Sequence, residues 1–328
     1  MSDIYLNGYE LNAPLKNDNS GFSKWGFCTK AGKEYFIKEF LSPVYPSGEG
    51  MSESQIAAKI RNCEKFEREK AALYNKINIS SRGNVIRIKD FFRFENHYYI
   101  VTDKISSLTL TPSEIAGLPM KDRLAICRVI AHEFYRLHSE GIVHCDVKPD
   151  NILLQRTKSG RITAKIIDFD NSFLVTNPPP LTEEFNGDLV YMSPEGFMRI
   201  REEDVELTTK LDIYSLALLF CYYLSGELPI YNDPDCDYAF EATLDGIAPQ
   251  FPYAVPEEFC DLFERMLSEN PDDRPDAYEV YLRFGGSDDR VPQRIYDNSY
   301  RKPVVKSERK PAQMGKKVDK YFYTPGEL

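Results

Sequence analysis

The sequence predicts an α+β protein with a bilobal architecture, in which a small antiparallel sheet with one helix precedes a larger, mainly helical lobe. Before residue 105, aromatic-rich runs alternate with turn residues, a pattern that predicts hairpins. After residue 105, apolar residues recur at helical spacing. We therefore divide the 328-residue chain into an N-lobe over residues 1–105, a C-lobe over residues 106–284 and a basic tail over residues 285–328.

In the N-lobe, four aromatic-rich runs predict two hairpins, at residues 22–29 with 34–40 and at residues 85–94 with 97–105. Gly32 lies in the first turn and Asn96 in the second, and both residue types favour turns. Apolar residues at helical spacing among charged ones predict one helix over residues 54–77.

In the C-lobe, Thr111 and Glu114 flank a proline and predict the start of a helix. A helical apolar stripe over residues 124–138 ends at Gly141. Residues 212–224 are nearly all apolar, so they predict a helix that is buried on every side. Residues 259–267 predict a further helix.

Composition excludes several classes of function. The net charge of −10 argues against general nucleic-acid binding, which needs basic surface. No apolar run is long enough to span a membrane, and the first residues lack the pattern of a secretory signal. The seven cysteines are scattered without a Cys-x-x-Cys pair, so we expect free thiols in the cytoplasm rather than disulfides or a zinc site.

The tail differs in charge from the rest of the chain. Residues 286–328 hold ten Lys/Arg and six Asp/Glu, with tyrosines among them and no periodicity. This composition predicts a flexible or docking tail. Recruitment of acidic substrates and nucleic-acid binding are the alternatives.

One short loop carries residue types suited to phosphoryl transfer. That reaction needs a phosphate clamp, magnesium ligands, a group that orients the attacking hydroxyl, and a positive charge near the γ-phosphate. Residues 144–151 read HCDVKPDN and supply Asp146, Lys148 and Asn151. A second carboxylate, Asp168, follows 17 residues after Asn151. Mg²⁺ prefers such hard oxygen ligands.

This loop resembles the catalytic loop of eukaryotic-type (Hanks-type) protein kinases, H-R-D-x-K-P-x-N, and Asp168-Phe169 resembles the start of their D-F-G motif. Further motifs of that family occur along the chain in the order that the family shows. Two precede the loop, Lys38 in YFIK and Glu69 in the predicted helix. Three follow it: Glu195 in YMSPE, Asp212 at the start of the buried helix, and Arg274. The resemblance covers about residues 10–284 and implies a protein-kinase-like fold.

The resemblance implies a catalytic role for four residues. Asp146 would orient the substrate hydroxyl, and Lys148 would stabilise charge on the transferred phosphoryl group. Asn151 and Asp168 would bind Mg²⁺. His144 would stack under Phe169, while Asp212 and the pair Glu195–Arg274 would anchor the structure.

The implied ATP site draws on both lobes. Lys38 would hold the phosphates and be held by Glu69, with Glu67 as the alternative partner. Gly21 would belong to the phosphate loop, and Trp25 and Phe36 would cover the adenine from above. Thr102 would be the gatekeeper, Asp103 would begin the hinge, and Leu153 would form the floor of the adenine site. Only Gly21 remains of the glycine-rich loop, and the aromatic roof leaves open whether adenine is sandwiched differently or the pocket is partly filled.

Three positions depart from the family. Cys145 replaces the arginine that binds a phosphate on the activation loop, so we expect a loop that is competent without phosphorylation. Asp170 replaces the glycine of D-F-G, which restricts the backbone there and places a second carboxylate near the metal. Asp188 replaces a threonine, and it could meet Lys148 but would repel Asp146.

The sequence therefore predicts an enzyme that uses ATP and Mg²⁺ to phosphorylate Ser/Thr hydroxyls of protein substrates. A pseudokinase that serves as a binding or scaffold module is the first alternative, favoured by the reduced glycine loop and the aromatic roof. A small-molecule phosphotransferase is the second, but the segment around Glu195 and Arg274 argues against it. No oligomeric state is predicted.

Overall fold

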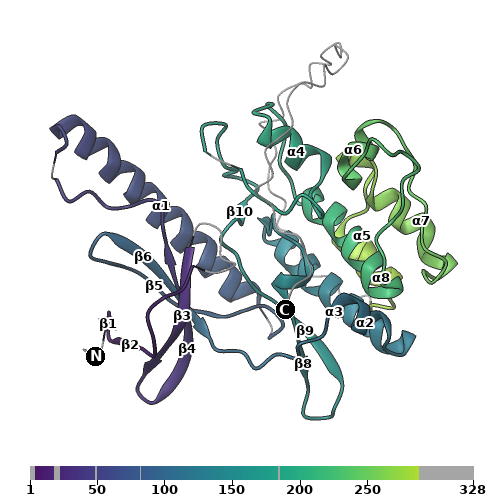
Figure 1. The fold of residues 1–328 in the computed structure, drawn as a ribbon, viewed down its shortest axis with the longest axis horizontal. Helices are drawn as coiled ribbons and strands as arrows, with labels where there is room; N and C mark the ends of the chain where they lie inside the picture. Colours follow the sequence, from purple (N-terminus) through teal and green to yellow (C-terminus); the bar gives the residue numbers. More distant parts are fainter. Residues whose placement is uncertain (1–3, 18–22, 49, 82, 184, 288–328) are drawn as a thin grey trace. The chain divides into compact units, whose positions relative to one another are not determined.

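The computed structural model describes residues 4–17, 23–48, 50–81, 83–183 and 185–287, all within one compact unit, Met1–Arg294. These residues form an N-lobe built on a sheet and a C-lobe built on helices (Figure 1). The predicted α+β class is confirmed. Gly21 and nearly all of the predicted tail lie outside the described residues. None of the described helices is both long and apolar enough to cross a membrane.

The N-lobe sheet is antiparallel, with the strand order β1-β2-β3-β4-β6-β5. The two predicted hairpins form, with β3 (Ser23–Lys30) against β4 (Lys33–Phe40) and β5 (Ile88–Phe94) against β6 (His97–Asp103). β4 also pairs with β6 and joins the two hairpins. The sequence pattern does not predict β1 (Tyr5–Leu6) or β2 (Tyr9–Leu11), because strands this short show no recognisable alternation.

The predicted N-lobe helix is α1 (Glu53–Ser80), which begins one residue earlier and ends three residues later than residues 54–77. Ser52 and Gln55 form a capping box at its start. The rings of Phe66 and Tyr74 pack against Phe91 of the sheet. These contacts set which face of α1 points inward.

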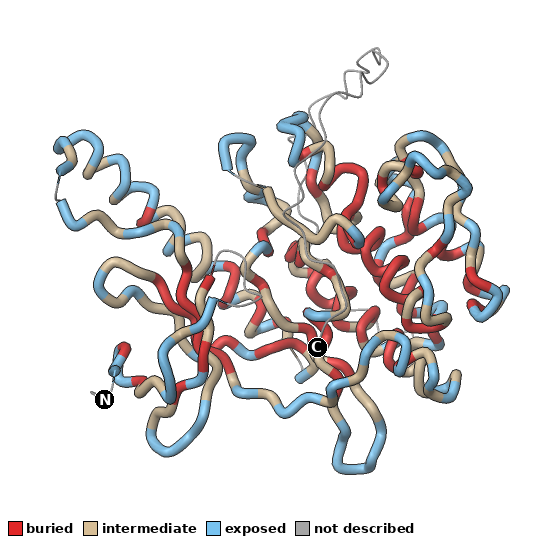
Figure 2. The backbone as a smooth tube through the Cα atoms, viewed as in Figure 1, coloured by how far each residue is buried: buried red, intermediate tan, exposed pale blue. Residues whose placement is uncertain are grey.

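The C-lobe helices surround a buried central one. They are α2 (Pro112–Ala116), α3 (Met120–Ser139), α4 (Pro194–Ile200), α5 (Lys210–Ser225), α6 (Ala239–Leu244), α7 (Glu257–Met266) and α8 (Ala277–Arg283). α5 is buried along nearly its whole length, as its apolar sequence predicts (Figure 2). It ends at Gly226, whose φ of 85° is the left-handed conformation that glycine adopts without strain.

Two short two-stranded sheets position the segments that bear the predicted catalytic residues. β7 (Ile142–Val143) pairs with β10 (Phe173–Leu174), and β8 (Ile152–Arg156) pairs with β9 (Ile162–Ile166). Residues 144–151 therefore connect β7 to β8, and their last three form the 3₁₀ turn η1 (Pro149–Asn151). Asp168 is the second residue after β9, and the backbone N–H of Ile167 donates to the carbonyl of Asn151, so the two segments lie side by side.

Candidate active site

One buried carboxylate fixes the loop over residues 144–151. Asp212 of α5 is 1% exposed, and its oxygens accept hydrogen bonds from the backbone N–H groups of His144 (2.8 Å) and Cys145 (2.9 Å). His138 Nε2 lies 2.9 Å from the same carboxylate. Cys145 has a φ of 68°, which is uncommon for a residue with a side chain. Asp212 thus stabilises a strained loop conformation, as the predicted role of an anchor requires.

Within this loop, one carboxylate oxygen of Asp146 is hydrogen-bonded and the other is not. Oδ2 accepts a hydrogen bond from Asn151 Nδ2 at 2.9 Å and lies 3.2 Å from Lys148 Nζ. Oδ1 is buried and has no hydrogen-bond partner among the described residues. A buried acceptor without a partner is costly, so Oδ1 is ready to accept a donor such as a hydroxyl group. The structure therefore brings Asp146, Lys148 and Asn151 together, as predicted.

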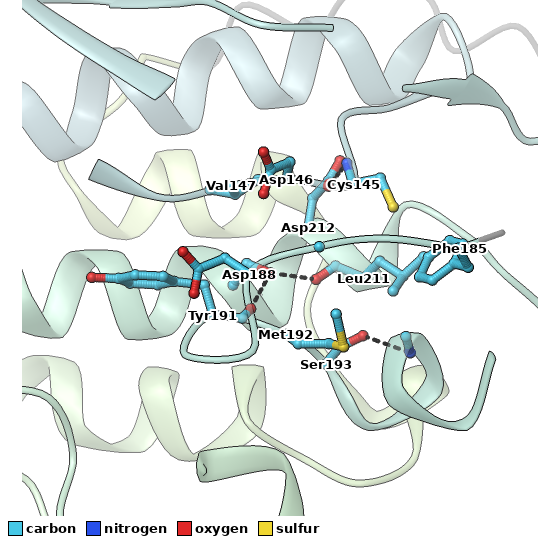
Figure 3. A pocket seen from close by; sticks show the side chains of 13 residues that line it. Cys145, Asp146, Val147, Phe185, Asp188, Tyr191, Met192, Ser193, Leu211 and Asp212 are labelled. Atoms are coloured by element: carbon cyan, nitrogen blue, oxygen red, sulfur yellow. Dashed lines mark hydrogen bonds between the residues drawn. The ribbon is translucent and has the colours of Figure 1, made fainter. Parts of the chain in front are cut away.

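Lys148 also links Asp146 to the segment that precedes α4. Asp146, Asp188 and Tyr191 line one narrow cavity (Figure 3). Lys148 Nζ lies 3.8 Å from Asp188 Oδ2. Burial lowers the pKa of Lys148, but the two carboxylates outweigh burial and raise it above its ordinary value. The ammonium between Asp146 and Asp188 offsets the repulsion expected between these carboxylates.

Lys38 joins the N-lobe to the loop that follows β9. Its Nζ lies 2.8 Å from Asp168 Oδ2 and 2.8 Å from Asp170 Oδ2. Lys70 of α1 donates to the backbone carbonyl of Asp170 at 2.5 Å. Lys38 is thus the cation that binds both carboxylates, while burial lowers the pKa of Lys70 despite the nearby charges of Asp170 and Asp168.

The two carboxylates of this cluster differ in proton affinity. Burial raises the pKa of Asp168, but the Lys38 ammonium outweighs burial and holds the pKa below its ordinary value. For Asp170, burial prevails over Lys38, and the charge of Asp168 adds to it, so the pKa lies above its ordinary value. Asp168 is therefore the carboxylate that stays ionised more readily, as a metal ligand must.

The predicted contact between Glu69 and Lys38 is not formed. Glu69 Oε1 lies 3.9 Å from Lys65 Nζ on the same helix, and Lys65 is bound to Glu183 at 2.9 Å. Adjacent residues of a helix point about 100° apart, and Lys70 takes the inward position that the prediction assigned to Glu69. The alternative partner, Glu67, is exposed. The role of Glu69 in ATP binding stays a prediction.

The predicted adenine roof lies on the same sheet face as Lys38. Trp25 and Lys38 are partners across β3 and β4, Phe36 stands two residues before Lys38, and Thr102 pairs with Phe36. Partners across strands, and residues two apart, share one face of a sheet. The Trp25 and Phe36 rings stack, with centroids 5.9 Å apart and planes at 23°. Trp25, Phe36 and Thr102 are therefore brought together.

Two of the other predicted ATP contacts are described: Asp103 ends β6, and Leu153 lies on β8. The carboxylate of Asp103 binds Lys33 at 2.9 Å and Lys89 at 2.8 Å, so only its backbone is left for a hinge contact. Leu153 is half-buried on β8. Gly21 lies outside the described residues.

The predicted structural pairs form. The rings of His144 and Phe169 lie 4.8 Å apart, and His144 Nε2 is 2.9 Å from the carbonyl oxygen of Ile167. Arg274 holds both oxygens of Glu195, at 2.6 and 2.9 Å. The Arg274 side chain is fully buried and the Glu195 side chain is 7% exposed.

The oxygen donors at this site suit Mg²⁺. Asn151 uses Nδ2 for its bonds to the carbonyl and the carboxylate of Asp146, which leaves its amide oxygen for another partner. Asp168 offers a carboxylate on the neighbouring loop. Over the described part of the chain, no three His, Cys, Asp or Glu side chains gather into a ready-made cation cage. Mg²⁺ ordinarily binds through one or two protein ligands together with substrate phosphates and water, and the pair Asn151 and Asp168 fits that pattern.

The chain matches the sequence profile of the protein kinase domain over residues 42–282. That range contains Asp146, Asn151, Asp168, Glu195 and Arg274. It begins after β4, so the predicted clamp residues Lys38, Trp25, Phe36 and Gly21 lie outside it.

Individual relatives are similar at low identity. Serine/threonine-protein kinase PkaA of Streptomyces coelicolor is 27% identical over 65% of this chain and 38% of its own length. Serine/threonine-protein kinase STE20 of Candida glabrata is 26% identical over 81% of this chain and 28% of its own length. This chain therefore matches well under half of each of these relatives. The kinase PK-1 of Cydia pomonella granulovirus has a similar structure, with a TM-score of 0.57, 21% identity, and coverage of 84% of this chain and 93% of that one.

Proposed function

The chain belongs to the protein kinase family, and on that basis we propose that it transfers the γ-phosphate of ATP to serine and threonine hydroxyls of protein substrates. The carboxylate of Asp146 carries the proposal. One oxygen is held by Asn151 and Lys148, and the other is buried without a partner among the described residues. A substrate hydroxyl needs an acceptor of this kind as it attacks. The relatives from Streptomyces coelicolor and Candida glabrata are both named serine/threonine-protein kinases, which supports this class of acceptor.

The residues of the site divide the work of the reaction. Asp146 Oδ1 accepts the hydrogen bond of the attacking hydroxyl and orients it, while Lys148 places a positive charge beside the transferred phosphoryl group. Lys38 would hold the α- and β-phosphates, and Trp25 and Phe36 would cover the adenine. Asn151 and Asp168 would hold Mg²⁺, which neutralises phosphate charge when it is bound.

We also propose that the activation segment works without phosphorylation. Cys145 stands where the family carries a phosphate-binding arginine, and a thiol offers no cation. Contacts within the chain hold the segment instead. Ser172 Oγ donates to the carbonyl of His144 at 2.9 Å, Glu183 binds Lys65, and Arg199 donates to the carbonyl of Pro179.

A pseudokinase is the second candidate, and one observation favours it. Trp25 and Phe36 stack on each other on the sheet face that would cover the adenine. If these rings fill that space, the chain would bind partners through the same fold without transferring phosphate.

One assay separates the candidates. Wild-type protein and Asp146→Ala are incubated with Mg²⁺, labelled ATP and a generic protein acceptor, and phosphorylated residues are identified by mass spectrometry. Label on Ser or Thr from wild type alone supports the kinase. Absence of label from both, with intact folding by circular dichroism, supports the pseudokinase. Turnover of ATP only when a small-molecule acceptor is added would support a small-molecule phosphotransferase.

A further inference from the structure

We infer that Asp170, rather than Glu69, is the carboxylate that positions Lys38 in this protein, and that α1 supports it with a cation, Lys70. The catalytic meaning of this inference rests on the proposed kinase activity. The contacts on which it stands are properties of the fold.

The two carboxylates that bind Lys38 can serve different purposes. A lysine ammonium has three donors, so it can bind Asp168 and Asp170 at once, as it does here at 2.8 Å each. Asp168 is the predicted metal ligand, and a bound Mg²⁺ would compete with Lys38 for it. Asp170 is not one of the two predicted metal ligands, Asn151 and Asp168. It can keep Lys38 in place while Asp168 turns to the metal.

The rotation of α1 about its axis directs Lys70, and not Glu69, toward the segment that contains Asp170. Phe66, Lys70 and Tyr74 are spaced four residues apart and so share one face of the helix. Phe66 and Tyr74 pack on the sheet, which points Lys70 inward to the carbonyl of Asp170. Glu69 would reach Lys38 only if α1 turned by about 100°, and that turn would pull both rings out of their packing.

The distribution of charge also disfavours a contact between Glu69 and Lys38. Lys65 binds both Glu69 and Glu183, so Glu69 already has a cation near the helix surface. Lys38 already binds both Asp168 and Asp170, and Lys70 donates to the backbone carbonyl of Asp170. A third carboxylate in this largely buried cluster would have no cation to offset it and would be repelled by the other two.

In this arrangement the loop after β9, and not movement of α1, would control the position of Lys38. In the family, the lysine is completed by a glutamate on the helix, so movement of the helix controls activity. Here the partner of Lys38 stands two residues after the metal ligand, in the same loop. Placing that loop therefore places Lys38 as well. This arrangement agrees with a kinase whose activation segment needs no phosphate.

A double-mutant cycle tests the contact without any nucleotide. The thermal midpoint Tm is measured for Lys38→Met, Asp170→Asn and Glu69→Gln, and for each acid variant combined with Lys38→Met. If Asp170 holds Lys38, the Tm changes of Lys38→Met and Asp170→Asn deviate from additivity by at least about 3 °C. Those of Lys38→Met and Glu69→Gln add within about 1 °C. Additivity at Asp170, or equal coupling at Glu69, would overturn the inference. Should Asp170→Asn not fold, Asp170→Glu and Asp170→Gly take its place in the same cycle.

Calorimetric titration with Mg·ADP tests the positioning role. We expect Asp170→Asn to weaken binding about tenfold or more, Glu69→Gln to change it less than twofold, and Asp170→Glu to restore part of the loss. The positioning role would be overturned if Asp170→Asn and Glu69→Gln lost equal affinity for Mg·ADP, or if Asp170→Asn lost none. If wild type binds no Mg·ADP, the proposed kinase activity fails, while the Tm cycle still decides which acid holds Lys38.

Discussion

Replacing Arg274 with Met tests the ion pair that holds α4 in the C-lobe. The guanidinium is fully buried and binds both oxygens of Glu195 at 2.6 and 2.9 Å. It also donates to backbone carbonyls of Ser268, Lys210 and Glu269. Arg274→Met leaves the Glu195 carboxylate buried without its partner, which costs about 3–5 kcal/mol. This is a large share of the roughly 5–15 kcal/mol that stabilises a typical protein.

Urea unfolding monitored by circular dichroism measures this loss, and two companion variants identify its cause. Arg274→Lys keeps the charge but not the two-pronged geometry, so it should lose less than Arg274→Met but remain below wild type. Glu195→Leu combined with Arg274→Met removes both charges and should be more stable than Arg274→Met alone. A loss below about 1 kcal/mol for Arg274→Met, or no recovery in the double variant, would refute this account of the buried pair.

Three further outcomes are expected. Thr176 and Thr182 are exposed on the activation segment, and changing both to Ala should leave the transfer rate within about twofold in a radiometric assay, whereas a tenfold collapse would show that phosphorylation matters. Trp25 is the single tryptophan and stacks on Phe36 on the sheet face predicted to cover the adenine, so binding of Mg·ADP should quench its fluorescence. Binding seen by calorimetry without a change in fluorescence would show that the adenine does not lie on that sheet face. Asp212→Asn can accept only one of the two backbone hydrogen bonds from His144 and Cys145. We therefore expect the rate of phosphoryl transfer to fall about a hundredfold while the affinity for Mg·ADP is kept. An equal loss of transfer rate and of affinity would instead indicate general unfolding.

Much of the fold could be predicted because its larger elements carry a local signal. Both N-lobe hairpins and α1 follow from runs of aromatic residues and from helical spacing. α5 follows from its almost uninterrupted apolar sequence. β1, β2 and β7 were beyond prediction because two or three residues show no period. Their pairing depends on partners that are distant in the sequence.

The site divides in the same way. Asp146, Lys148 and Asn151 lie in one loop, so their proximity is set by a few residues of backbone. The partner of Lys38 is different, because the choice between Glu69 and Asp170 depends on the rotation of α1. Helical periodicity identifies the inward face only to within about one residue, which is the difference between Glu69 and Lys70. The contact between Lys38 and Asp170 spans 132 residues and has no local signal.

The role of Asp146 in orienting the substrate hydroxyl is tested by the rate of phosphoryl transfer from Mg·ATP to a protein acceptor. This rate is measured for wild type and Asp146→Asn at saturating ATP. Asp272→Asn, an exposed carboxylate of the 3₁₀ turn η2 (Pro271–Asp273), is the matched control. We expect Asp146→Asn to transfer at least about a hundredfold more slowly than wild type with Mg·ADP affinity preserved, and Asp272→Asn to match wild type. Equal rates in wild type and Asp146→Asn, or no phosphorylated Ser or Thr produced by wild type, would contradict the assignment of this loop as a kinase active site.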